Sequence, residues 1–207
     1  MAYATVEDLL HEMGMPAEDA DEDKLQEKLD AAQRIIDRVT KRTFEASADE
    51  TRLIDCSEET VNGRILYIPY DLCQITTVLN GDGVEVTVDE YVTEPRLRTV
   101  SGSTSVMPAV HDAHPWYALK LKLSSGKVWE YEDDPEEAIS ITGRFAYSVT
   151  APPDIKDACI RLADWLYQQR NDLRDRQESI VSEDGTVLLM GDLPRDVQAR
   201  LIPYVRV

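Results

Sequence analysis

Two histidines and an aspartate lie close together in the sequence, at His111, Asp112 and His114. Imidazole nitrogens and a carboxylate oxygen are ligands that zinc accepts. The surrounding residues 96–115 carry the Ser, Gly, Thr and Pro that are typical of a loop, and no further ligand motif accompanies the group. We therefore expect no metal site here, although a small metal-dependent hydrolase stays an alternative.

The densest run of charge is EYEDDPEE at residues 130–137. Carboxylates bind calcium, and paired carboxyl groups can act as general acid and base. The alternating acids and the glycine of a calcium-binding EF-hand loop are missing, however. In a chain with 40 acidic residues, neighbouring acids also arise by chance. We expect a solvated acidic loop, either on the surface or lining a channel, formed by Glu130, Glu132, Asp133, Asp134, Glu136 and Glu137.

The three cysteines, Cys56, Cys73 and Cys159, are odd in number and far apart. They fit neither a disulfide framework nor a zinc motif. Cys159 falls in an apolar helical stripe, which predicts a core position. A G-x-S-x-G nucleophile elbow and a phosphate-binding glycine loop are both missing. The sequence thus predicts no catalytic residues, no cofactor and a protein that is not an enzyme.

The chain has 207 residues, 43% of them hydrophobic, and a formal net charge of −18. This length suits one large domain or two small ones. Free nucleic acid and anionic membranes are poor partners, because both attract Lys and Arg. The first residues lack the features of a signal peptide, and no stretch approaches the roughly 20 apolar residues of a membrane span. We expect a protein that is made and assembled in the cytoplasm.

Helical patterns occupy both ends of the chain. Residues 5–14 and about 21–42 each repeat apolar side chains at steps of three and four, with acids first. A third helix begins at residues 151–154 and runs into QQRNDLRDRQE, whose charge on all sides predicts fraying or projection. A last helix begins at Leu193-Pro194 and ends at Pro203.

Strand patterns fill the middle of the chain. They are predicted at residues 51–56, 64–69, 74–79, 84–88, 116–124 and 138–148. NGDG at 80–83 predicts a hairpin turn between 74–79 and 84–88, where VEVTV would place its valines on one face. Gly143 predicts a bend in the last strand.

These elements predict an α+β protein: a small helical bundle formed by the N- and C-terminal helices, with an inserted antiparallel β region. The helical part would comprise residues 1–44 and 150–207, and the β part residues 45–149. The two helical ends should meet, because the apolar faces at 25–39 and 155–166 each need covering.

Three motifs carry a family resemblance: LDAAQRIIDRVTKRTF at 29–44, ITGRFAYSVTAPPDIKDACIRLADWLYQQR at 141–170, and LPRDVQARLIPYVRV at 193–207. In this order they resemble head–tail connector proteins of long-tailed bacteriophages, also called adaptor or head-completion proteins. Lys41 stands where the family commonly has glycine. The first motif matches at Ala31, Ala32, Ile35, Ile36, Asp37, Thr40, Arg42 and Phe44. The second matches at Gly143, Tyr147, Pro152, Pro153, Ile155, Lys156, Ala158, Leu162, Ala163, Leu166, Tyr167 and Arg170.

The resemblance implies a structural virion protein that docks as a dodecameric ring under the portal protein and extends the DNA channel toward the neck and tail. The implied partners are the portal protein, neighbouring copies, and a stopper, neck or tail protein. DNA would pass through without specific binding, repelled by the acidic loop. Alternatives are a stopper or other tail-completion protein, and a carbohydrate- or protein-binding β module.

The resemblance also places the portal contact in the C-terminal segment. Tyr204 and Arg206 would be its anchors, because both side chains bury area and still form hydrogen bonds at their tips. The alternative left open is that this segment packs on the helices of its own chain. The expected interface residues are Leu193, Pro203, Tyr204, Val205, Arg206 and Val207. Ion pairs to a neighbouring acidic subunit are expected from Arg170, Arg174 and Arg176.

Overall fold

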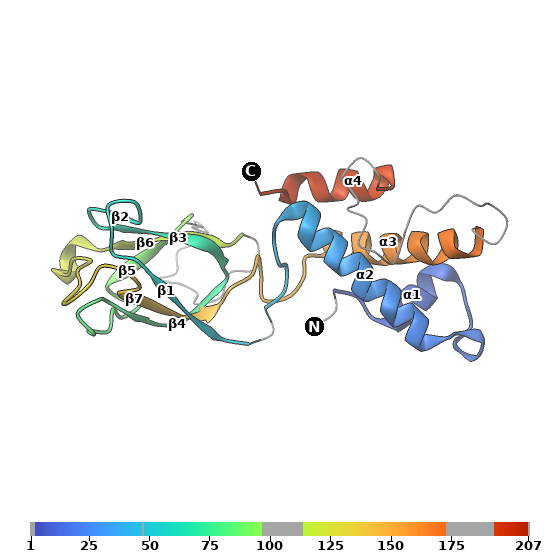
Figure 1. The fold of residues 1–207 in the computed structure, drawn as a ribbon, viewed down its shortest axis with the longest axis horizontal. Coiled ribbons are helices and arrows are strands. Elements are labelled where there is room, and N and C mark those ends of the chain that lie inside the picture. The colour runs from blue at the N-terminus through green and yellow to red at the C-terminus, as the bar shows by residue number, and fades with distance from the viewer. Residues whose placement is uncertain (1–2, 47, 97–113, 173–192, 207) are drawn as a thin grey trace, which may run out of the picture. The chain divides into compact units, whose positions relative to one another are not determined.

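A computed structural model of the protein describes residues 3–46, 48–96, 114–172 and 193–206. The chain divides into two compact units, Met1–Phe44 with Ala151–Val207, and Glu45–Thr150. The first, the helical unit, contains the α-helices, and the second, the β unit, contains the antiparallel strands (Figure 1). The expected mixture of helices and antiparallel sheets is confirmed. No helix in the described ranges is long and apolar enough to cross a membrane.

Helix α1 (Val6–Met13) begins and ends where its sequence signals predict. The Thr5 hydroxyl accepts a hydrogen bond from the Asp8 amide at 3.2 Å, and the Asp8 carboxylate accepts one from the Thr5 amide at 3.0 Å. This capping box satisfies donors that a helix leaves open at its start. Gly14 ends the helix in the left-handed conformation, with φ of 64°. A short 3₁₀ turn, η1 (Ala17–Asp19), leads to the next helix.

Helix α2 (Glu22–Thr40) starts at Asp21, whose side chain accepts a hydrogen bond from the Lys24 amide. It ends at Lys41, which adopts the left-handed conformation with φ of 56°. The predicted apolar stripe is the buried face of this helix. Its fully buried members are Leu25, Leu29, Ala32 and Ile36.

Helix α3 (Pro153–Asp172) is the element on which the other helices pack: α1, α2 and α4 (Arg195–Leu201) all contact it. A 3₁₀ turn, η4 (Ile202–Tyr204), follows α4. Burial raises the pKa of the Cys159 thiol to about 12, as expected for a core cysteine. The buried side chains of α3 are Ile155, Ala158, Cys159, Ile160, Leu162, Ala163 and Leu166.

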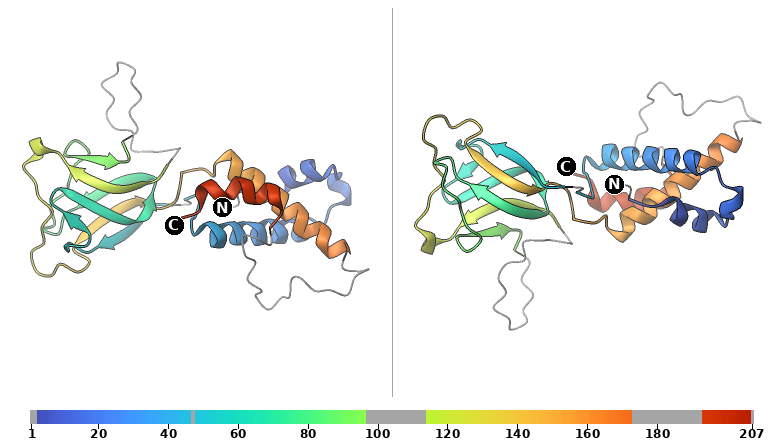
Figure 2. Two further views of the ribbon diagram at one scale, coloured as in Figure 1. Left: turned by 90° about the horizontal axis from the view of Figure 1, so that it is seen from above. Right: turned by 90° about the horizontal axis from the view of Figure 1, so that it is seen from below.

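The β unit contains two antiparallel sheets whose inner faces share one core (Figure 1, Figure 2). One sheet has the order β1 (Glu50–Ile54), β7 (Ile139–Arg144) and β4 (Gln74–Leu79). The other has the order β2 (Val61–Asn62), β3 (Ile65–Leu72), β6 (Trp116–Leu121) and β5 (Tyr91–Glu94). The largest inward side chains from both sheets include Leu66, Leu72, Leu119, Leu121, Ile139 and Ile141.

Strand register determines which loops meet. Ile54 of β1 and Leu79 of β4 pair with Ile139 and Ser140 at the start of β7. The loops that follow β1 and β4 and the segment before β7 therefore lie at one end of the β unit, here called the loop end. Glu45 and Ser148, near the two limits of the unit, form a bridge beyond the opposite ends of β1 and β7.

One strand prediction needs correction. Residues 84–88 form no extended strand: a single bridge joins Leu79 to Glu85, and the chain then turns because Glu90 accepts hydrogen bonds from the Thr87 amide and hydroxyl. Only Val86 of the three valines is buried. Gly143 lies inside β7, where a Cβ would collide with the Gln74 carbonyl oxygen, so close approach of β4 explains the glycine.

Candidate functional site

The C-terminal segment packs on the helices of its own unit. Leu193 is buried, and Val197 and Leu201 of α4 are completely buried. The Tyr204 ring meets Phe44 edge-on at 5.5 Å between centroids, and the Arg42 Nε donates a hydrogen bond to the Tyr204 carbonyl oxygen at 2.8 Å. These contacts fix the segment along the end of α2.

The predicted anchor residues are thus partly engaged within the chain. The Tyr204 hydroxyl donates to the Asp154 carboxylate at 3.5 Å, and the Arg206 amide donates to the Thr40 carbonyl oxygen at 2.9 Å. Tyr204, Val205 and Arg206 are half-buried, whereas Pro203 is exposed and Ile202 is 63% exposed. The alternative of internal packing therefore holds for much of this segment. Val207 lies outside the described residues.

A buried polar contact beside this segment was not expected from the sequence. The Tyr3 hydroxyl donates to the Asp37 carboxylate at 2.5 Å and accepts from the Phe44 amide at 2.8 Å. Burial raises the pKa of Asp37 to about 6 and that of Tyr3 above its usual range. Asp37 does not belong to the apolar stripe of α2, so its burial does not follow from the helical periodicity. Nothing in the local pattern indicates that the N-terminal Tyr3 covers it.

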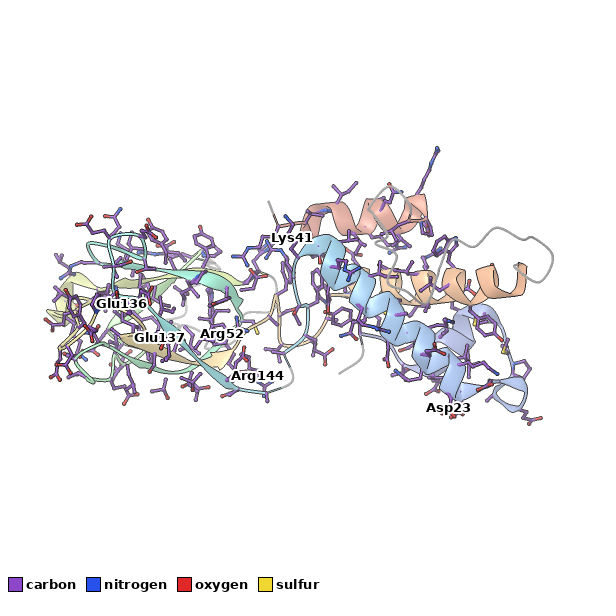
Figure 3. All side chains as sticks on the ribbon, viewed as in Figure 1. Asp23, Lys41, Arg52, Glu136, Glu137 and Arg144 are labelled. Atoms are coloured by element: carbon purple, nitrogen blue, oxygen red, sulfur yellow. The ribbon has the colours of Figure 1, made fainter. Side chains whose placement is uncertain are left out.

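The acidic run of residues 130–137 forms an exposed segment at the loop end. All six of its carboxylates are exposed, and the positions of Glu136 and Glu137 are labelled in Figure 3. Its backbone is fixed: the Cys56 amide donates to the Pro135 carbonyl oxygen, and the Glu137 amide to the Asp55 carboxylate, each at 2.7 Å. The prediction of a surface loop is consistent with this geometry.

The histidine pair is only partly described. His111 and Asp112 lie outside the described residues. The Nδ1 atom of His114 lies 3.0 Å from the Tyr147 hydroxyl oxygen, within hydrogen-bonding distance. Within the described ranges, no group of three His, Cys, Asp or Glu side chains could hold a metal ion.

The predicted ion pairs to a neighbouring subunit lie largely outside the described residues. Arg174 and Arg176 are not described, and for Arg170 the structure gives only its place in α3.

A second charged cluster lies at the end of the β unit opposite the loop end. The Arg52 guanidinium stacks over the rings of Tyr70 and Phe145, at 4.3 and 4.4 Å from their centroids. Arg144, labelled with Arg52 in Figure 3, pairs with Asp49 at 3.2 Å. A hydrogen bond from Thr76 and, second to it, the contact with Arg144 lower the pKa of Asp49. Arg144 and Thr76 come from β7 and β4, so the cluster ties the Asp49 segment to this sheet.

Two loops at the loop end are organised around one buried amide. Asn80, 4% exposed, donates through its backbone amide to the Val84 carbonyl oxygen at 2.9 Å and through its side chain to that of Val128 at 3.0 Å. Its side-chain oxygen accepts from the Glu130 amide at 3.3 Å. At the adjacent Gly81, a Cβ would lie 2.5 Å from the Glu130 carbonyl oxygen. The sequence predicted only a turn here.

Comparison with known proteins adds no assignment: no protein-family model matches this chain, and no curated protein matches it.

Proposed function

We propose that this protein is a head–tail connector of a long-tailed bacteriophage, a structural component of the virion. The observation that carries the proposal is the order and spacing of the three terminal motifs. It is supported by the division of the chain: the first motif, residues 151–170 of the second motif and the third motif belong to one compact unit, whereas residues 141–150 of the second motif belong to the β unit. Motif residues such as Ile36, Phe44 and Ile155 are core residues of that unit.

In this proposal the helical unit is a small helical bundle that serves as the connector core. Copies assemble as a ring under the portal protein and continue the DNA channel to a stopper, neck or tail protein. The net charge of −18 suits this role, because an acidic wall repels DNA and leaves it free to slide.

In this proposal the C-terminal segment contacts the portal protein, chiefly through its exposed residues. Ile202 and Pro203 offer exposed apolar area, and the half-buried Tyr204 and Arg206 flank them. Because the Tyr204 ring packs edge-on against Phe44, its replacement by alanine would disturb the helical unit as well as any interface. Ile202 is the sharper probe, since its side chain is mostly in solvent.

The test is to mix the purified protein with purified portal protein and to examine the complexes by electron microscopy. We expect rings of the protein under the portal. Ile202→Ser should markedly reduce the fraction of portal particles that carry a ring. Leu123→Ser makes the same kind of change, from aliphatic to polar, at a side chain 85% exposed in the β unit, and it should leave this fraction unchanged. Absence of rings with the unaltered protein would sink the proposal, and equal docking by both variants would refute the assigned contact.

A further inference from the structure

Exposed apolar side chains gather on two loops of the loop end, residues 80–90 and 122–132. Most of these residues are valine or leucine, whose side chains proteins usually bury. Exposed apolar side chains grouped on neighbouring loops commonly mark an interaction site. The exposed fractions are 49% for Val84, 39% for Val88, 85% for Leu123, 49% for Val128 and 46% for Tyr131.

Hydrogen bonds hold three of these residues side by side. Asn80 bonds to the carbonyl oxygens of both Val84 and Val128, and Tyr131 forms a bridge with the adjacent Gly81. The Glu132 amide also donates to the Gly81 carbonyl oxygen. The apolar side chains are therefore presented by a fixed backbone, which lowers the entropy lost on binding.

Lysines join the other two residues to the same surface. The Lys122 Nζ donates to the Asp89 carbonyl oxygen at 2.6 Å, which brings Leu123 next to the segment that carries Val88. The Lys127 Nζ donates to the Glu85 carbonyl oxygen at 2.5 Å and pairs with Glu90 at 2.8 Å. Both ammonium groups are thus engaged within the surface.

The carboxylates around these apolar side chains, unlike the two lysines, are mostly not paired with an opposite charge. None of the six acids of residues 130–137 makes an ion pair with another described residue, and Glu85 and Asp89 are also exposed. The negative charge of this surface disfavours binding of nucleic acid. It also disfavours binding of the loop end of a second copy, which would bring like charges together. A partner with basic side chains complements this negative charge.

We propose that this loop-end surface, formed by residues 80–90 and 122–137, binds a partner protein through a segment that bears Lys or Arg between apolar side chains. The apolar residues would supply most of the affinity, and the carboxylates would select and orient the partner. The inference goes beyond the connector proposal and does not depend on it, because it rests only on the surface of the β unit.

The test uses the full-length protein and three short fluorescein-labelled peptides followed by fluorescence anisotropy. One peptide alternates Lys and Leu, one alternates Lys and Ser, and one alternates Glu and Leu. The Lys–Leu peptide should bind at least about tenfold more tightly than either of the others, and its affinity should fall as salt is added. Equal binding of the Lys–Ser peptide would indicate general charge attraction and overturn the proposal, as would no binding.

Variants locate the surface. Leu123→Ser combined with Val84→Ser should weaken Lys–Leu binding by about tenfold, because both side chains are exposed and each removes apolar contact area. Ile202→Ser, in the helical unit, is the matched control and should bind normally. Amide chemical shifts of the unaltered protein should change in residues 80–90 and 122–137. Changes confined to the helical unit, or unaltered binding by the double variant, would contradict the proposal even if portal docking succeeds.

Discussion

The surroundings of the Asp37 carboxyl group favour its protonated form more than water does. Burial raises its pKa to about 6 from an ordinary 3.8, although the hydrogen bond from Tyr3 acts in the opposite direction. A group whose pKa is higher in the folded state binds its proton more tightly there than in the unfolded chain. Its contribution to stability is therefore fully present below about pH 4 and is lost as the pH rises through 6.

Replacing Asp37 by Asn should remove this dependence. The amide oxygen can still accept the Tyr3 hydrogen bond, and no charge is buried at high pH. We expect Asp37→Asn to be more stable than the unaltered protein at pH 8, by about 1 kcal/mol given the partial burial, and the difference to disappear near pH 4. Thermal unfolding followed by circular dichroism between pH 4 and pH 8 measures this.

The control is Glu27→Gln, an exposed acid on the same helix. Its pH profile should follow that of the unaltered protein. If Asp37→Asn is less stable at pH 8, the carboxylate is stabilised by its surroundings and the direction argued for its pKa is wrong.

At the scale of elements, the end of α2 has an unfavourable residue. Lys41 occupies the left-handed conformation with φ of 56°, in the place where the resembled family commonly has glycine. A left-handed backbone costs a residue with a Cβ on the order of 1 kcal/mol, and glycine avoids that cost while losing more chain entropy on folding. The Lys41 side chain is exposed, so little packing opposes the change.

Lys41→Gly should therefore stabilise the helical unit, by about 0.5 kcal/mol after the entropy loss is included. Urea unfolding followed by helical circular dichroism gives the change in free energy. Glu27→Gly is the matched control, since the same substitution within α2 should destabilise by about 1 kcal/mol. Destabilisation by both variants would show that the Lys41 side chain contributes more than its backbone strain.

The helices follow from sequence more closely than the strands. Apolar periodicity and capping signals locate α1 to within a residue at each end, because both are local properties of the chain. The alternation in VEVTV predicts a strand that does not form, since the turn after Val86 depends on Glu90 and on Lys127 from a distant loop. The short strands β2 and β5 escape prediction for a similar reason: their pairing with β3 and β6 is non-local.

Candidate sites show the same limit. The exposure of residues 130–137 follows from their charge, and it could be predicted. The exposed valines could not, because alternation predicts burial for all three on one face, and only Val86 is buried. The packing of Tyr204 against Phe44 joins residues far apart in the chain, which local patterns do not encode.

At the scale of the whole molecule, the β unit is a continuous insertion with its own core. Its two limits lie together, since Glu45 bridges Ser148, and the core side chains of both sheets fall between residues 54 and 145. A segment with adjacent ends and a separate core has the properties of an independently folding domain. The helical unit, by contrast, needs segments from both ends of the chain.

We therefore expect residues 45–150 alone to fold. Trp116 and Trp129 are buried in the β unit, and Trp165 lies in α3, so a Trp165→Phe variant of the full chain reports the β unit through tryptophan fluorescence. The isolated segment should unfold cooperatively in urea at the same midpoint as that signal, because its core contacts are all internal. A fragment without a cooperative transition would mean that the β unit requires the helical unit, and that the insertion is not a separate folding domain.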